Sequence, residues 1–175
     1  MNIIVAVDKN WGIGKDNDLL FCLPLDLKHF KDTTLNKVVV MGSNTLRSLP
    51  NGKPLKNRTN IVLSTKNFDA EKNEFGQDFI HCKDHFSLFS TLKNFNIDDI
   101  FIIGGAKVYA DLLPFCKAAI VTKVDADGGA SHYFSDLDKN PDWTVLSKSD
   151  PIQDLKHNIS FWVYKNINKK EFKIY

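Results

Sequence analysis

One acidic residue, Asp26, interrupts the apolar stretch LLFCLPLDL (residues 19–27). Pro24 suits the first turn of a helix, because its missing N–H needs no partner there. In such a helix Asp26 shares a face with Phe30, and this face is expected to point toward the core. A carboxylate buried among apolar side chains needs hydrogen-bond donors, which a flat, nitrogen-rich heterocycle could supply through two adjacent N–H groups. A structural role stays open, because an acid in a first turn also interacts with the helix dipole by about 0.3–1 kcal/mol.

Two corners that contain glycine lie between strand-like and helix-like runs. They are VVVMGSNTLRSL, with Gly42 at the corner, and IFIIGGAKVYADLL, with Gly104 and Gly105. Glycine and a helix N-terminus together let a phosphate approach free backbone N–H groups. Each corner alone is also typical of a structural turn, and neither matches GxGxxG or GxxxxGK[ST]. Together they favour a dinucleotide, whose diphosphate they could hold from both ends.

Short apolar runs that are rich in β-branched residues alternate with helix-like runs along the chain. This order favours an α/β fold, a mostly parallel sheet covered by helices on both faces. We expect a single domain with about eight strands, an antiparallel pair at the C-terminal edge and about four helices. The expected strands are 2–7, 37–41, 60–64, 79–82, 100–103, 119–124, 143–149 and 159–166, and the expected helices are 24–33, 43–49, 86–95 and 106–114. The domain is expected to span residues 1–166, followed by a solvated basic tail at 167–175.

Composition excludes several classes of function. The chain has 175 residues, of which 43% are hydrophobic and 25% charged, and its net charge of +2 gives no field for nucleic acid or anionic lipid. Cys22, Cys82 and Cys116 have neither disulfide nor metal-ligand spacing and predict reduced thiols. The N-terminal run MNIIVAV is too short for a signal sequence or a membrane span. We expect a cytoplasmic monomer that binds neither a membrane nor nucleic acid.

Six segments, in order, are similar to dihydrofolate reductases. They are GIGKDNDL (12–19), LPLDLKHFK (23–31), VVVMGSNTLRSL (38–49), KPLKNRTNIVLS (53–64), IFIIGGAKVYADLLP (100–114) and AIVTKVDAD (119–127). The resemblance covers nearly the whole chain. It implies reduction of 7,8-dihydrofolate to 5,6,7,8-tetrahydrofolate by NADPH, with hydride passing from nicotinamide C4 to pterin C6 and a water-assisted proton to N5.

The resemblance also implies roles for individual residues. Asp26 would hold pterin N3 and the 2-amino group, with Thr122 supporting its carboxylate. Arg58 would grip the α-carboxylate of the substrate's glutamate, a bidentate task that suits arginine better than lysine. The peptide bond between Gly104 and Gly105 is expected to be cis.

The implied site residues form three groups, and no metal ligand is among them. The catalytic group is Asp26, Leu19, Thr122 and Tyr109. The substrate group is Ile4, Ala6, Asp26, Leu27, Phe30, Leu49, Leu55, Arg58, Ile103 and Thr122. The cofactor group is Ala6, Ile13, Gly14, Asn17, Leu19, Gly42, Ser43, Asn44, Thr45, Leu63, Ser64, Thr65, Lys66, Ile103, Gly104, Gly105, Ala106, Lys107, Val108 and Tyr109, of which Ile13, Gly14 and Asn17 belong to a loop that closes over the nicotinamide.

Several positions depart from the family's pattern. Leu20 and Phe21 replace its usual Pro-Trp, which removes an indole N–H that normally holds a water near the pterin. Ser43 stands where many members carry an Arg for the 2′-phosphate, and Ser64, Thr65 and Lys66 could compensate. In the loop at residues 130–135, Ser131 and Ser135 replace the usual Asp and Pro, in a segment that commonly braces the nicotinamide-side loop.

Two alternatives stay open. A related reductase of a riboflavin-pathway pyrimidine would share the fold, although its substrate has no glutamate tail for Arg58. A non-catalytic module that binds a dinucleotide or folate is compatible with the changes at Phe21 and Ser43.

Overall fold

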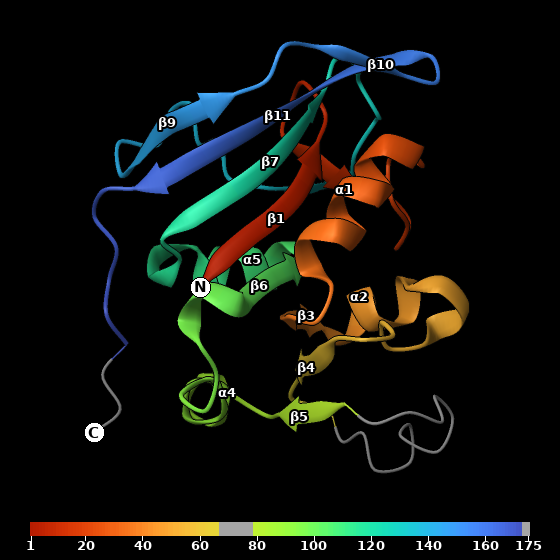
Figure 1. The fold of residues 1–175 in the computed structure, drawn as a ribbon. Helices are drawn as coiled ribbons and strands as arrows, with labels where there is room; N and C mark the ends of the chain where they lie inside the picture. The colour runs from red at the N-terminus through yellow and green to blue at the C-terminus, as the bar shows by residue number, and fades with distance from the viewer. Residues whose placement is uncertain (67–78, 173–175) are drawn as a thin grey trace.

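The computed structural model describes residues 1–66 and 79–172, which form one mixed β-sheet with helices on both faces (Figure 1). The strands of the main sheet lie in the order β5-β4-β3-β6-β1-β7-β11, and both β9 and β10 pair with β11. Neighbours from β5 to β7 are parallel, whereas β11 runs antiparallel to β7, β9 and β10. The predicted mostly parallel α/β sheet with an antiparallel C-terminal edge is therefore confirmed.

All eight expected strands and all four expected helices are present. The strands are β1 (Asn2–Val7), β3 (Val38–Gly42), β4 (Thr59–Leu63), β5 (Ile80–Cys82), β6 (Ile100–Gly104), β7 (Ala118–Val124), β9 (Trp143–Lys148) and β11 (His157–Asn166). The helices are α1 (Pro24–Thr34), α2 (Ser43–Ser48), α4 (His85–Leu92) and α5 (Ala106–Leu112), and the short 3-10 turns are η1 (Pro50–Gly52), η2 (Ile97–Asp99) and η3 (Leu113–Phe115).

Three short strands were not predicted. β10 (Ile152–Asp154) forms within the stretch that we expected to be a polar connection, where it pairs with β11. β2 (Gly12–Gly14) and β8 (His132–Tyr133) form a separate small sheet beside the main one. These runs are too short to give a clear alternating pattern, so their pairing depends on tertiary contacts.

The alternation of side chains along the central strands builds two cores. Val38 and Val40 in β3 belong to the core under α4 and α5, whereas Val39 and Met41 belong to the core under α1 and α2. Figure 1 shows α1 and α2 on one side of the sheet and α5 on the other. Burial of both faces explains why the strands read as continuous apolar runs.

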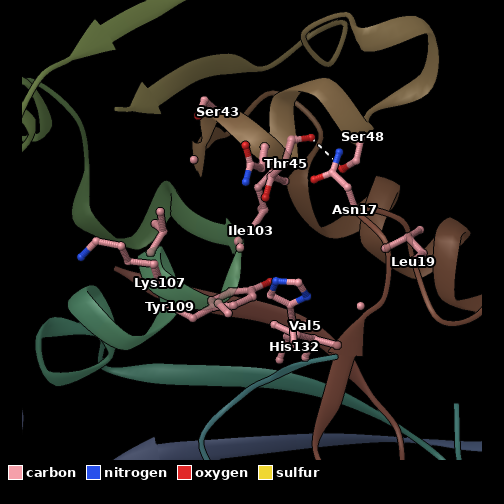
Figure 2. A pocket seen from close by; sticks show the side chains of 18 of the residues that line it. Val5, Asn17, Leu19, Ser43, Thr45, Ser48, Ile103, Lys107, Tyr109 and His132 are labelled. Carbon is pink, nitrogen blue, oxygen red and sulfur yellow. Dashed lines mark hydrogen bonds between the residues drawn. The ribbon is translucent and has the colours of Figure 1, made fainter. Parts of the chain in front are cut away.

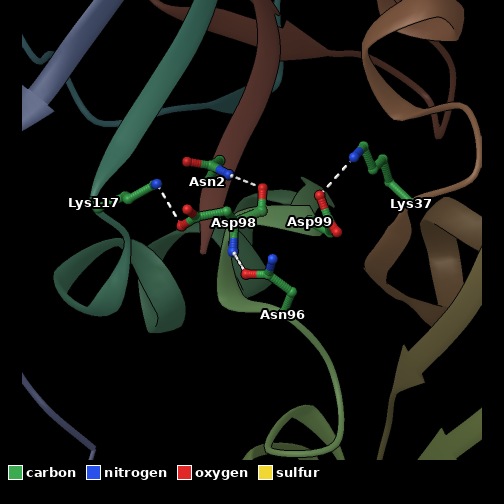
Figure 3. A network of polar contacts seen from close by, with 6 residues as sticks. All are labelled: Asn2, Lys37, Asn96, Asp98, Asp99 and Lys117. Atoms are coloured by element: carbon green, nitrogen blue, oxygen red, sulfur yellow. Dashed lines mark hydrogen bonds and ion pairs between the residues drawn. The ribbon is translucent and has the colours of Figure 1, made fainter.

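A polar network fastens the amino ends of the parallel strands (Figure 3). Lys117 forms an ion pair of 2.5 Å with Asp98, and Lys37 forms one of 2.5 Å with Asp99. The side chain of Asn2 donates to the carbonyl of Asp98 at 3.0 Å. These contacts join the amino ends of the strands to the segments that precede them, on the side opposite to their carboxyl ends.

Residues 167–171 of the expected basic tail are exposed, and the half-buried Phe172 contacts the rest of the protein. The ring of Phe172 stacks on Phe89 with centroids 3.7 Å apart, and the N–H of Lys170 donates to the carbonyl of Pro114 at 2.8 Å. Residues 173–175 lie outside the described residues. No helix in the described ranges is long and apolar enough to cross a membrane.

Candidate active site

A cavity of about 610 Å³ opens at the carboxyl ends of β1, β3, β4 and β6 (Figure 2). Ligands of open α/β sheets bind at this end of the strands, because the loops there converge. All twenty residues expected at the cofactor line this cavity, and so does Asp26. Figure 2 shows Thr45 and Ser43 facing Tyr109 and Lys107 across the cavity, with Asn17 and Leu19 at one side.

The two glycine corners lie next to each other, because β3 and β6 are parallel neighbours with Met41 opposite Gly104. A Cβ added at Gly42 would lie 3.2 Å from Val108, and one added at Gly105 would lie 3.3 Å from the hydroxyl of Thr45. Gly104 has a φ of +123°, which side chains rarely tolerate. The predicted cis peptide bond between Gly104 and Gly105 is confirmed. Gly42 and Gly105 are half-buried, whereas Gly104 is buried beside Tyr109 and Thr45.

Hydroxyl and lysine side chains line the cavity beyond these corners. Ser64, Thr65 and Lys66 follow β4, and Lys83 follows the neighbouring strand β5. Lys107, which also lines the cavity, is already paired with Asp111 at 2.9 Å. Lys83 was missed in the sequence. Its place directly after a strand parallel to β4 is the signal that could have revealed it, since the carboxyl ends of β4 and β5 lie on the same side of the sheet.

The carboxyl of Asp26 is partly buried in the first turn of α1. Burial raises its pKa above the ordinary value of 3.8, and the nearby charge of Asp154 raises it further. A hydrogen bond with the side chain of Thr122 and the proximity of His29 both act in the opposite direction. The structure therefore brings the two predicted residues, Asp26 and Thr122, together. The His29 ring packs on Phe161 with centroids 4.4 Å apart.

Tyr109 forms part of the cavity floor. Its hydroxyl donates a hydrogen bond of 2.8 Å to the carbonyl of Ile4, and its ring meets Phe134 edge to face. Burial, with a further contribution from Asp26, raises the pKa of Tyr109, so the hydroxyl remains a donor.

A buried carboxylate, Asp8, anchors the base of the loop that carries Ile13, Gly14 and Asn17. Its Oδ1 accepts the N–H groups of Asn10 and Gly12 at 2.8 and 2.7 Å, and its Oδ2 accepts that of Gly128 at 3.0 Å. Asp8 thus fastens both loops beside the cavity. Sequence reasoning did not single it out.

Three further residues at or beside this wall were missed or differ from the family's pattern. His132, in β8, lines the cavity, and Figure 2 shows its ring pointing inward. Ser131 keeps a loop contact through its backbone N–H, which donates to the carbonyl of Gly14 at 3.0 Å. Phe21 also lines the cavity and meets His157 edge to face at 5.0 Å.

The expected substrate wall extends from the cavity along α1. Phe30, Leu49 and Leu55 pack on the core that contains Ile4 and Ile103. Of these five only Ile103 lines the cavity itself, and Leu27 is 40% exposed and does not line it. These side chains therefore form an apolar surface next to the cavity.

Arg58 lies at the far end of α1 and does not line the main cavity. Its guanidinium donates to the carbonyls of Lys56 and Lys31 at 2.7 and 3.2 Å and to the hydroxyl of Thr34 at 3.3 Å. Desolvation lowers its pKa. A bidentate grip on a carboxylate would require some of these bonds to be exchanged.

Comparison with known proteins agrees with this geometry. The model of the dihydrofolate reductase family matches residues 1–167. The chain is 32% identical to the dihydrofolate reductase of Bacillus subtilis strain 168 over 175 residues, which is 98% of this chain and 97% of the relative. It is 36% identical to that of Buchnera aphidicola subsp. Acyrthosiphon pisum, over 83% of this chain and 85% of the relative. It is 35% identical to that of Haemophilus influenzae, over 78% and 79%. The chain therefore belongs to the dihydrofolate reductase family, oxidoreductases that reduce dihydrofolate with a nicotinamide dinucleotide.

Proposed function

We propose that the chain reduces 7,8-dihydrofolate to 5,6,7,8-tetrahydrofolate with NADPH and that Asp26 anchors the pterin. The observation that carries this proposal is the position of Asp26. Its partly buried carboxyl, in contact with Thr122, faces the same cavity as the two glycine corners. A heterocycle bound at Asp26 and a dinucleotide bound at the corners would therefore meet inside one cavity.

The residues around the cavity fit a dinucleotide that carries an additional phosphate. Its volume of about 610 Å³ lies within the usual range of ligand sites, roughly 300–1,000 Å³. Gly42, Gly104 and Gly105 would let a diphosphate approach the backbone. Lys66 and Lys83, after two neighbouring strands, would supply charge for the third phosphate in place of the Arg that Ser43 replaces. When bound, the reduced cofactor supplies the hydride that C6 of the pterin accepts.

Asp26 would perform two tasks in this reaction. Its two oxygens would accept the N–H groups of pterin N3 and the 2-amino group, which fixes the plane of the ring. Because burial raises its pKa, Asp26 would hold a proton nearer neutral pH than an exposed aspartate does, and this favours proton delivery toward N5 through water. Ile103 and Tyr109 would lie beside the reacting edge.

Arg58 would bind the glutamate α-carboxylate at the outer end of the substrate surface. Its contacts with Lys31 and Thr34 orient the guanidinium at the end of α1 before substrate binds. Partial burial would strengthen a bond to a carboxylate, since water competes less for it.

The proposal includes a monomer that works in the cytoplasm. The three cysteines are free, which suits a reducing compartment. Size-exclusion chromatography with light scattering would test the monomer.

The test of the function is steady-state turnover of purified protein, followed by the loss of NADPH absorbance. We expect turnover with dihydrofolate and a KM for NADPH at least about tenfold below that for NADH, since a charged hydrogen-bonded contact contributes roughly 1.5–3 kcal/mol. Folded protein that binds NADPH without turnover would support a non-catalytic module instead. Turnover only with the riboflavin-pathway pyrimidine would support the related reductase.

A further inference from the structure

The first turn of α1 is capped by a residue from the other end of the chain. Leu23 occupies the N-cap position and has no side chain that could accept a hydrogen bond. Instead, Oδ2 of Asp154, in β10, accepts the N–H of Leu25 at 2.8 Å and approaches the N–H of Asp26 at 3.4 Å. The acid proposed to anchor the pterin is thus held through its own backbone by a second acid.

Burial, strand pairing and packing around Asp154 fix its position. Its side chain is 3% exposed, which is unusual for a carboxylate. It pairs with His157 across the turn between β10 and β11, where Leu155 adopts a positive φ of 55°. A small cluster of buried apolar side chains, Leu23, Val124 and Ile159, packs where the start of α1 meets the sheet. The contact between the hairpin and the helix is therefore fixed by packing as well as by hydrogen bonds.

The charge of Asp154 also acts on Asp26. Both carboxyls lie at the start of one helix, and the negative charge of Asp154 adds to burial in raising the pKa of Asp26. Thr122 from β7 and His29 from α1 oppose this shift, and Tyr109 from α5 feels the charge of Asp26 in turn. Of the groups that act on Asp26, Asp154 is the one that both binds its backbone and carries a like charge.

We propose that Asp154 is a positioning residue for dihydrofolate reduction, which holds the first turn of α1, and with it the carboxyl of Asp26, in the geometry that binds the pterin. Asp154 itself does not line the cavity and is not expected to touch the substrate. The inference rests on the proposed role of Asp26. It assigns to the β10–β11 hairpin a function in substrate binding that is independent of the cofactor-binding corners.

Two substitutions distinguish the N-cap hydrogen bond of Asp154 from the effect of its negative charge. Asp154→Asn keeps an N-cap acceptor that is about as good as Asp, but removes the negative charge. Asp154→Ala removes both and leaves the buried N–H of Leu25 without its acceptor. Asp150→Asn is the matched control, because Asp150 is an exposed carboxylate just before β10 and its loss changes the net charge equally.

The measurements are KM for dihydrofolate, KM for NADPH, turnover against pH and the melting temperature of each full-length variant. For Asp154→Ala we expect KM for dihydrofolate to rise about tenfold while KM for NADPH stays within about twofold. For Asp154→Asn we expect KM for dihydrofolate within about threefold of the original protein. As the pH is raised, turnover of this variant should begin to fall at a lower pH than turnover of the original protein. The reason is that Asp26 loses its proton more easily once the negative charge of Asp154 is gone. Asp150→Asn should match the original protein in all four measurements.

Two outcomes would overturn the inference. One is that both Asp154 variants keep the KM for dihydrofolate and the pH profile of the original protein. The other is a lower melting temperature accompanied by equal changes in the two KM values, which would mean that Asp154 only stabilises the fold. Turnover by the original protein and its loss in Asp26→Asn test the proposed function separately, so a failure of the Asp154 variants alone rejects only the present inference.

Discussion

The hydroxyl of Tyr109, in α5, donates a buried hydrogen bond of 2.8 Å to the backbone carbonyl of Ile4, in β1. This bond connects the helix that follows the second glycine corner with the central strand of the sheet. β1 also provides Val5 and Ala6 to the cavity, so the bond holds the cofactor side and the substrate side of the site in register.

Replacement of Tyr109 by Phe should therefore destabilise the protein. The carbonyl of Ile4 would remain buried without its donor, which typically costs about 1–3 kcal/mol in the free energy of unfolding. Urea denaturation measures this quantity directly. Tyr133→Phe is the matched control, because the Tyr133 hydroxyl also donates to a carbonyl at 2.8 Å, but at an exposed position where water can replace it. Equal losses in the two variants would contradict the importance of the buried bond.

Local patterns in the sequence were sufficient to predict the main helices and strands and many residues of the candidate site. The runs that became β3 and β6 are apolar because both faces of these strands are covered, and the glycines at their ends mark the two corners. Asp26 could be selected because it is the one acid in an apolar stretch. Each of these signals lies within about ten consecutive residues.

The contacts that the sequence did not reveal join segments that are far apart in the chain. Asp154 caps α1 from 129 residues away, and its own strand, β10, exists only because it pairs with β11. Lys83 and His132 reach the cavity because of the order of the strands, which no local pattern specifies. The direction of the Arg58 side chain was also not specified locally. It donates to the carbonyl of Lys31 at the end of α1, since a long flexible side chain takes its direction from tertiary contacts.

Lys83 should determine cofactor preference. We expect Lys83→Gln to raise KM for NADPH about tenfold and to leave KM for NADH nearly unchanged, because only NADPH carries the 2′-phosphate that the ammonium group would meet. Steady-state kinetics with both cofactors measure the effect. Lys93→Gln, at an exposed position at the end of α4, removes the same charge away from the cavity. A rise of both KM values by the same factor would mean that Lys83 does not discriminate between them.

Asp8 should control the loops at the cavity. Asp8→Asn would place an amide N–H₂ group where backbone N–H groups now converge, and we expect a loss of about 1–3 kcal/mol in unfolding free energy. Weaker NADPH binding should accompany it, because Ile13 and Gly14 line the cavity. Fluorescence titration with NADPH and urea denaturation provide the two readouts. Asp125→Asn, at an exposed acid directly after β7, should leave both within error.

Asp26 should reduce the stability of the folded protein at neutral pH. Because its pKa is higher in the folded chain than in the unfolded chain, the folded state binds the proton more tightly, and stability falls as pH rises above the unfolded value of 3.8. Asp26→Asn removes this dependence. Its melting temperature should exceed that of the original protein near neutral pH, and the difference should shrink as pH falls toward about 3, where the Asp26 carboxyl is mostly protonated in the unfolded as well as in the folded chain. A constant difference across this range would show that burial does not shift the Asp26 carboxyl.

The most direct test of Asp26 as the pterin anchor compares turnover and cofactor affinity in Asp26→Asn. We expect turnover of dihydrofolate near neutral pH to fall by at least about a hundredfold, because the amide cannot accept both N–H groups of the pterin or deliver a proton. The Kd for NADPH, measured by fluorescence titration of the same sample, should stay within about twofold. Unchanged turnover, or an equal loss of turnover and NADPH affinity, would contradict the role of Asp26.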